Sequence, residues 1–311
     1  MRTLPFLSLA SFTLLFGLAG CDGGTDTTSG AGGGTSTATG GTETTTSTPT
    51  EHVTPLDEFL PKATGACPTL TTGMVTVSPD DFTRDVQIWI GDEAKTMDGP
   101  IVFFWHGAGG SPKDAVYALS QPVIDEIVAM GGILVAPVHD PAAGQLPWFL
   151  SLGGSNESDL RVMDEVLACA IDQVGVDLRH IHSVGFSAGA MNTTQVGWRR
   201  SGYIASVVTF SGAQIGSPDD QDPTNKYPAM AFHGGSSDVV IIEFQPNTEK
   251  YVQGLKDEGH FAFICDHGKG HTVPTDARMP AWQFLKDHPF GVQPEPYKDA
   301  LPASFPSYCS L

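Results

Sequence analysis

The chain has 311 residues, and its 35 acidic and 16 basic side chains give a net charge of −19 at pH 7. Nucleic acid and anionic membrane surfaces repel such an acidic chain, so neither is expected as a partner. The same charge weakly favours neutral over polyanionic substrates.

The first twenty residues have the composition of an export signal. Arg2 precedes an apolar run from Leu4 to Phe16, and small residues follow it. The segment ends in Leu18-Ala19-Gly20-Cys21, which resembles the lipobox of bacterial lipoproteins. We expect residues 1–20 to be removed and Cys21 to carry a lipid anchor on a periplasmic or cell-surface face, with an ordinary signal peptide and a chance cysteine as the alternative. The apolar run is too short for a transmembrane helix.

Residues 21–51 consist almost entirely of Gly, Thr, Ser and Ala after the cysteine. They have no apolar periodicity that could bury a core, and we predict a flexible tether. Residues 52–311 are different, because apolar runs and helical patterns alternate there, and their length fits one large catalytic domain.

Eight short apolar runs in this domain are typical of strands. The run Ile101-Val102-Phe103-Phe104-Trp105 fits a central strand that is covered on both faces. The predicted strands are 73–77, 86–90, 101–105, 133–137, 180–186, 205–210, 229–232 and 261–265. The predicted helices are about 113–130, 157–173, 188–200, 247–258 and 277–287. This alternation predicts an α/β fold with a doubly wound, mostly parallel eight-stranded sheet, flanking helices and no large cap domain.

The segment Gly185-Phe186-Ser187-Ala188-Gly189 joins a predicted strand to a predicted helix. Gly-x-Ser-x-Gly in that context is the pattern of a nucleophile elbow, which makes Ser187 the candidate nucleophile. The glycines are needed because a side chain two positions before or after the serine would collide with the neighbouring strand or helix. A serine hydroxyl also needs a histidine to accept its proton and a carboxylate to orient that imidazole.

Three further motifs follow predicted strands in a fixed order. They are His106-Gly107-Ala108-Gly109-Gly110, His233-Gly234-Gly235-Ser236-Ser237-Asp238 and Gly268-Lys269-Gly270-His271. With the elbow, this order resembles the α/β-hydrolase superfamily and, within it, the branch of secreted polyhydroxybutyrate depolymerases and feruloyl esterases, over about residues 65–290. The resemblance implies Ser187 as nucleophile, Asp238 as acid and His271 as base, and the order Ser, Asp, His is the one that α/β-hydrolases use.

Other residues could fill two of these roles. His267 is the alternative base, and the alternative carboxylates are Asp222, Asp266 and Asp276. We prefer His271 because Gly268 and Gly270 supply a loop that can carry it over the sheet.

Ester cleavage also needs backbone N–H groups that stabilise the oxyanion, each typically worth about 2.7 to 4 kcal/mol. Ala188 is the first expected donor, because it follows the nucleophile at a helix N-terminus. The resemblance implies Ala108 as the second donor, with Gly107 as the alternative. Trp148, in the apolar segment 141–156, and His139, after the strand at 133–137, are predicted to contact the substrate in an open cleft that suits a polymer or a bulky ester.

Four cysteines besides Cys21 fit an exported protein. Cys67, Cys169, Cys265 and Cys309 form an even set, which suggests up to two disulfides in an oxidising compartment. The sequence does not choose among the three pairings. Cys67 with Cys309, near the two ends of the domain, is one candidate pair, and Cys169 and Cys265 could equally be buried free thiols.

These motifs predict a serine esterase that hydrolyses carboxylic esters through an acyl-enzyme. The resemblance implies a polyhydroxybutyrate depolymerase-like, feruloyl esterase-like or acetyl-xylan esterase-like substrate. The alternatives are a serine peptidase of the same fold and a non-catalytic surface lipoprotein that binds a glycan or a partner. No metal or cofactor is predicted, because the chain has neither His-Glu-x-x-His nor Cys-x-x-Cys, and no Lys-Ser/Thr follows the glycine motif as in a phosphate loop.

Overall fold

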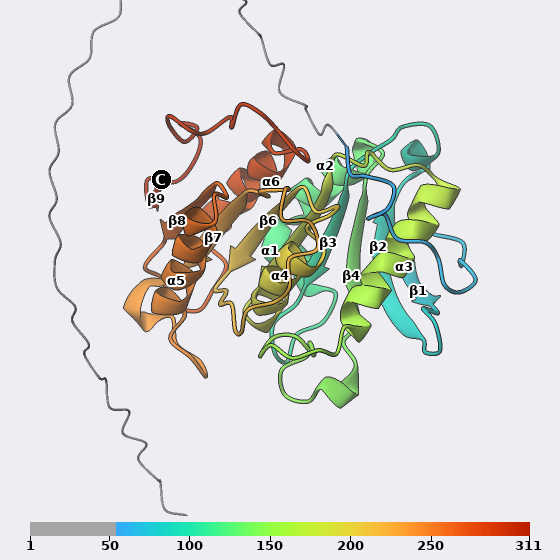
Figure 1. Cartoon of the computed structure of the whole chain (residues 1–311), viewed down its shortest axis with the longest axis horizontal. Helices are drawn as coiled ribbons and strands as arrows, with labels where there is room; N and C mark the ends of the chain where they lie inside the picture. The colour runs from blue at the N-terminus through green and yellow to red at the C-terminus, as the bar shows by residue number, and fades with distance from the viewer. Residues whose placement is uncertain (1–53) are drawn as a thin grey trace, which may run out of the picture. The chain divides into compact units, whose positions relative to one another are not determined.

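The computed structural model describes residues 54–311, so the predicted signal at 1–20, the lipidated Cys21 and the tether at 21–51 lie outside the described residues. Residues 54–311 form one nine-stranded sheet with helices on both faces (Figure 1). The strand order is β1-β2-β4-β3-β5-β6-β7-β8-β9.

The centre of the sheet is parallel and its margins are antiparallel. The strands are β1 (Gly73–Val77), β2 (Arg84–Ile90), β3 (Ile101–Trp105), β4 (Ile133–Pro137), β5 (Ile181–Phe186), β6 (Ser206–Phe210), β7 (Ala229–His233), β8 (Ala262–Asp266) and β9 (Cys309–Ser310). Strands β4, β3, β5, β6, β7 and β8 pair in parallel, whereas β1 and β2 at one margin and β9 at the other are antiparallel to their neighbours.

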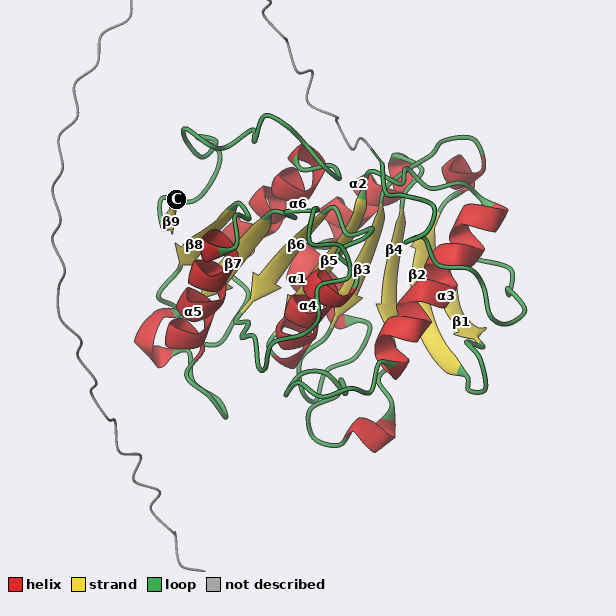
Figure 2. Ribbon diagram, in the orientation of Figure 1, coloured by secondary structure: helices red, strands yellow, loops and turns green. Residues whose placement is uncertain are grey.

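Six α-helices of the described chain cover the sheet. They are α1 (Asp114–Leu119), α2 (Gln121–Ala129), α3 (Ser158–Gln173), α4 (Ala188–Arg199), α5 (Phe244–Asp257) and α6 (Arg278–Asp287). Helices α3, α4 and α5 lie in front of the sheet in Figure 2, and α1, α2 and α6 lie behind it. Each face has its own apolar core, and β3 is buried throughout because Phe103 and Trp105 enter one core while Val102 and Phe104 enter the other.

The structure contains all eight predicted strands and differs from the prediction in three details. The ninth strand, β9, has two residues, too few to show a periodicity in the sequence. The single helix predicted at 113–130 is two helices, because Ser120 has a φ of 80° and interrupts the helical hydrogen bonding. Helix α5 begins at Phe244 rather than at 247, since Pro246 is tolerated in a first turn.

Two disulfides join the four cysteines, and the candidate pair Cys67–Cys309 is wrong. Cys67 is bonded to Cys169 on α3, which ties the segment before β1 to the front of the sheet. Cys265 on β8 is bonded to Cys309, directly opposite it on β9. Neither Cys169 nor Cys265 is therefore a free thiol. The sequence could not choose the pairing because it depends on which strand the C-terminal segment joins.

The parallel strands give the sheet two chemically distinct edges. The segments carrying Ser187, Asp238 and His271 leave β5, β7 and β8 at their carboxyl ends, where α/β folds place ligands. The loops that lead into β7 and β8 meet at the opposite edge. Within residues 54–311, no helix combines the length and the apolarity needed to span a bilayer.

Candidate active site

Ser187 occupies the sharp turn between β5 and α4. Its φ of 57° lies in the left-handed region that non-glycine residues seldom adopt. The flanking glycines are required sterically, because a Cβ on Gly185 would overlap the Gly189 carbonyl and a Cβ on Gly189 would overlap the Trp105 carbonyl. The Ser187 N–H donates to Phe210 O at 2.8 Å, which fixes the turn against β6.

The structure brings Ser187, His271 and Asp238 into one chain of hydrogen bonds. His271 Nε2 lies 2.9 Å from Ser187 Oγ, and His271 Nδ1 lies 2.6 Å from Asp238 Oδ1. A carboxylate can only accept, so Nδ1 carries the proton and the Nε2 lone pair faces the serine hydroxyl. In this tautomer the imidazole can remove the proton of Ser187.

Asp238 is fully buried and ionised. Burial alone would raise the pKa of its carboxyl, but hydrogen bonds from His271, the Gly234 N–H and Ser211 Oγ outweigh burial and hold the pKa below its ordinary value. Oδ2 accepts from Ser211 Oγ at 2.7 Å and from the Gly234 N–H at 2.8 Å. The remaining oxygen, Oδ1, is thereby directed at His271.

The imidazole of His271 is held between two phenylalanine rings. Its centroid lies 4.9 Å from that of Phe186 and 4.8 Å from that of Phe244. Phe186 directly precedes Ser187, and the Phe244 N–H donates to Asp238 O at 2.9 Å, so both rings that contact His271 are tied to its hydrogen-bond partners. The structure thereby brings Phe186, Phe244 and Ser211 into contact with His271 or Asp238, and the sequence analysis assigned no role to these three residues.

Side chains from distant segments hold the loop that carries His271. Tyr117 Oη of α1 accepts from the Val273 N–H at 2.9 Å and lies 2.6 Å from Thr272 Oγ1. Tyr308, which precedes the disulfide-bonded Cys309, donates to Asp276 Oδ1 at 3.0 Å. The Gly270 N–H donates to Gly234 O at 3.0 Å, which joins this loop to the one before Asp238.

Among residues 54–311, the alternative acids and the alternative base make no hydrogen bond to Ser187 and engage other partners. His267 Nδ1 accepts from the Lys269 N–H, and Asp276 is engaged by Lys269 and Tyr308. Asp266 contacts His233, and Asp222 lies at the opposite edge of the sheet. Among these candidates, Asp238 and His271 alone form the hydrogen-bond chain to the serine.

The loop after β3 approaches the nucleophile closely. A Cβ on Gly107 would lie 3.1 Å from Ser187 Cβ. The Gly107 carbonyl accepts from the Gly110 N–H at 3.0 Å and from His106 Nδ1 at 2.8 Å, so it faces the His106 ring. In a trans peptide the N–H of the next residue points the opposite way, so the Ala108 N–H is directed away from His106. Ala188 begins α4, where backbone N–H groups have no partner within the helix.

An apolar cleft of about 40 Å³ opens beside Ser187. The residues lining it are Ala108, Leu146, Leu152, Ser187, Ala188, Met191, Val240, Ile241, Ile242 and Phe244. Three of them are unusually exposed for aliphatic side chains: Leu152 is 61% exposed, Val240 59% and Ile241 69%. The apolar run 239–242, directly after Asp238, was the sequence signal for this rim, and the sequence analysis did not use it.

Trp148 and His139 lie behind the loop after β3 and not in the cleft. Trp148 is only 1% exposed, and its indole N–H donates to His106 O at 2.8 Å. His139 Nδ1 lies 3.3 Å from His106 Nε2. The predicted contact of Trp148 with a substrate does not fit the structure, because the ring is buried and packs inward against Trp105. The segment 141–156 does reach the cleft, through Leu146 and Leu152.

Neither a metal site nor a cofactor is suggested by the donor set around Ser187. Within residues 54–311 there is no cluster of three or more His, Cys, Asp or Glu side chains arranged to bind a metal ion.

The fold has close counterparts among esterases. The native structure of pOPH superposes with a TM-score of 0.61 at 18% identity, over 79% of this chain and 96% of that chain. A thermostable esterase gives a TM-score of 0.57 at 17% identity, over 70% and 62%. The Bacillus cereus carboxylesterase gives 0.51 at 15%, over 65% and 93%. At these identities the likeness shows the fold, which is that of the α/β-hydrolases.

Sequence comparison assigns the chain to a family. A family model described as phospholipase/carboxylesterase matches residues 92–288, more than half of the chain, and the chain belongs to this family of α/β-hydrolases. The feruloyl esterase D of Neurospora crassa is 26% identical over 184 residues, which make up 57% of this chain and 62% of that esterase. The chain thus spans less than two thirds of that relative's length. The resemblance to the α/β-hydrolase esterases is confirmed.

Proposed function

We propose that the protein is a serine esterase in which Ser187, His271 and Asp238 cleave carboxylic esters through an acyl-enzyme. The observation that carries this proposal is the hydrogen-bond chain from Ser187 Oγ to His271 Nε2 at 2.9 Å and from His271 Nδ1 to Asp238 at 2.6 Å. Membership in a carboxylesterase family supports it.

The reaction proceeds in two acyl transfers. His271 Nε2 takes the proton of Ser187 as Oγ attacks the ester carbonyl, and Asp238 stabilises the imidazolium that forms. The N–H groups of Ala188 and Ala108 donate to the oxyanion. His271 then protonates the departing alcohol, and the acyl group stays on Ser187. Water, deprotonated by His271, attacks this acyl-enzyme and releases the acid while the proton returns to Ser187.

The apolar cleft supports esters with an apolar acyl group. Its lining has no charged side chain, so an apolar acyl group that enters it desolvates no charged group of the protein. Its small volume and exposed rim suit a chain that lies across the mouth, as in a polyester or a feruloylated polymer. We therefore place hydroxyalkanoate and feruloyl esters ahead of acetyl esters as substrates.

The two disulfides support export, because such bonds persist in oxidising compartments. We extend the proposal to the expected organisation, with a signal at 1–20, lipidated Cys21, a tether at 21–51 and the catalytic domain at 52–311. Expression of the full chain with Cys21→Ser should move the protein from the membrane fraction to the soluble exported fraction, and retention in the membrane fraction would refute the anchor.

The catalytic assignment is tested with a fluorophosphonate probe. We expect one adduct on Ser187 by peptide mass mapping and no adduct in Ser187→Ala. Acyl preference is then measured as the rates at which unlabelled wild type and unlabelled Ser187→Ala hydrolyse p-nitrophenyl acetate, p-nitrophenyl butyrate and methyl ferulate. A folded wild-type protein that takes no adduct would support the non-catalytic alternative, and amidase activity exceeding esterase activity would support the peptidase.

A further inference from the structure

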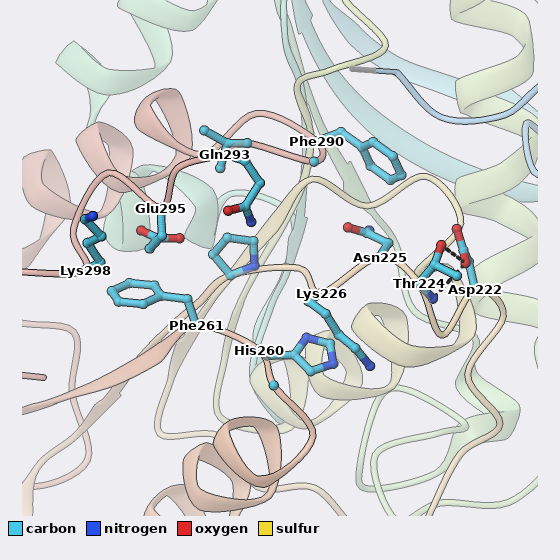
Figure 3. A pocket seen from close by; sticks show the side chains of 14 residues that line it. Asp222, Thr224, Asn225, Lys226, His260, Phe261, Phe290, Gln293, Glu295 and Lys298 are labelled. Carbon is cyan, nitrogen blue, oxygen red and sulfur yellow. Dashed lines mark hydrogen bonds between the residues drawn. The ribbon is translucent and has the colours of Figure 1, made fainter. Parts of the chain in front are cut away.

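A second and larger pocket lies at the opposite edge of the sheet from Ser187. Its volume is about 480 Å³, in the range of small-molecule sites, against about 40 Å³ for the cleft. Its walls are the loops that enter β7 and β8 and the segment after α6 (Figure 3). Since β7 has five residues, at about 3.3 Å each, the pocket lies about 16 Å from the edge that carries Asp238.

Asn225 presents a fixed acceptor to this pocket. Its side chain is 7% exposed, and its amide N–H groups donate to Ser201 O at 2.7 Å and Ile204 O at 2.9 Å. These bonds fix the rotamer and leave Oδ1 without a hydrogen-bond partner in residues 54–311. In Figure 3 this oxygen points toward the middle of the pocket.

Two carboxylates are held in the same way. Asp222 Oδ1 accepts from Thr224 N and Oγ1, and Glu295 Oε1 accepts from His288 Nε2 and from the Tyr297 N–H. In the described part of the chain, the second oxygen of each carboxylate has no protein partner. The pocket therefore has three acceptors whose positions are set before any ligand arrives.

The donors of this pocket lie on exposed side chains. Lys226, Gln293 and Lys298 are exposed, and the structure gives their side chains no hydrogen bond or ion pair within residues 54–311. In Figure 3, Lys298 and Glu295 lie at one end, Asp222 and Asn225 at the other, and Gln293 and Lys226 between them. We call this elongated pocket the trough. The ring of Phe261 gives it an apolar surface.

Acidic and basic side chains alternate along the trough, and this arrangement limits the class of ligand that it can bind. An anion would face Asp222 and Glu295, and a cation would face Lys226 and Lys298. An apolar ligand would leave the second oxygens of Asp222 and Glu295 without a hydrogen-bond partner. A neutral polyhydroxylated ring avoids both costs, because each hydroxyl can donate to a carboxylate and accept from an ammonium group, and its C–H face can pack on Phe261.

We propose that this trough is a binding site for a neutral oligosaccharide. It holds the enzyme on a polysaccharide while Ser187 remains open at the opposite edge of the sheet. The site does not depend on the proposed hydrolysis, because no residue of the trough contacts Ser187, His271 or Asp238.

The test is isothermal titration of the protein with neutral xylo-, cello-, manno- and maltohexaose. We expect at least one to bind with one-to-one stoichiometry, and to bind equally to protein whose serine has been blocked with a fluorophosphonate. Lys226→Ala/Gln293→Ala should raise the dissociation constant at least tenfold. Both side chains are exposed, so the variant should keep the wild-type unfolding temperature and its rate on p-nitrophenyl butyrate.

The matched control is Lys256→Ala, which removes an exposed lysine from α5 outside the trough. Binding by none of the four hexasaccharides at millimolar concentration would overturn the proposal. Unchanged affinity in the double variant would overturn it as well. Tighter binding of an oligouronate or an amino-sugar oligomer would contradict the proposal that the ligand is neutral. Loss of binding after fluorophosphonate treatment would show that the saccharide binds in the cleft beside Ser187 and not in the trough.

Discussion

The two edges of one sheet differ in almost every property that defines a binding site. At the carboxyl edge, a cleft of about 40 Å³ has apolar walls, and Ser187 beside it forms one hydrogen-bond chain with His271 and Asp238. At the amino edge, a pocket of about 480 Å³ is lined by charged side chains and by three acceptor oxygens that have no protein partner among residues 54–311. Cavity size therefore does not locate chemistry in this protein, because reactivity requires a few atoms at fixed distances and not volume.

The sharpest test of this comparison is Ser187→Ala. The variant should lose at least about 10,000-fold in kcat on p-nitrophenyl butyrate, because the nucleophile, base and acid act as one unit. The double variant Ser187→Ala/Asp238→Ala should have a kcat only slightly lower than that of Ser187→Ala. Lys298→Ala at the amino edge is the control and should keep the wild-type rate. A folded Ser187→Ala protein with substantial activity would place the chemistry elsewhere.

Asp238→Asn should reduce kcat by about 1,000- to 10,000-fold. The amide can present an N–H to His271 Nδ1 and favour the tautomer that cannot accept from Ser187. Steady-state rates with unchanged circular dichroism measure this effect. A loss below tenfold would mean that a different carboxylate orients His271.

The Asp238 carboxylate should also stabilise the folded protein in a defined pH range. Its pKa is lower in the folded protein than in the unfolded chain, so its contribution is present above about pH 4 and is lost as the pH falls through the folded pKa. The stability difference between wild type and Asp238→Asn should shrink between pH 5 and pH 3, measured by urea unfolding. A difference that grows on acidification would contradict the assignment.

The two disulfides offer a matched pair of variants. Removing either by double Cys→Ser substitution should cost about 2 to 4 kcal/mol of unfolding free energy. Cys265→Ser/Cys309→Ser should also reduce kcat by about 10- to 100-fold, because Tyr308 beside Cys309 holds the segment that carries His271. Cys67→Ser/Cys169→Ser should leave kcat unchanged. Equal effects on kcat would show that the C-terminal segment stabilises the fold without positioning the base.

The rim of the cleft should give the smallest measurable effect on hydrolysis. Val240→Ser/Ile241→Ser removes two exposed aliphatic side chains beside Ser187. The preference for butyrate over acetate should fall by about fourfold for each acyl methylene that loses its contact, corresponding to about 0.8 kcal/mol. Met279→Ser, an exposed apolar residue on α6, is the control. An unchanged ratio would mean that the acyl group does not touch this rim.

Local sequence patterns were sufficient for most of the fold and for naming the three residues that the structure joins in one hydrogen-bond chain. Strand β3 was recognisable because five consecutive apolar residues need two covered faces, and Ser187 because an elbow needs glycines at 185 and 189. Asp238 and His271 followed from chain order in a resembling superfamily. Trp148 was misassigned because a sequence shows that a residue is apolar but not in which direction its side chain packs.

The sequence by itself determined the α/β alternation, the elbow and the order of the reactive residues, because each of these depends on neighbours within a few positions. The tertiary structure alone decided the disulfide pairing, the exposed rim beside Ser187 and the trough at the amino edge. These features join segments that are up to 102 residues apart, as in Cys67–Cys169. Their contacts depend on strand order and loop direction, which local periodicity does not specify.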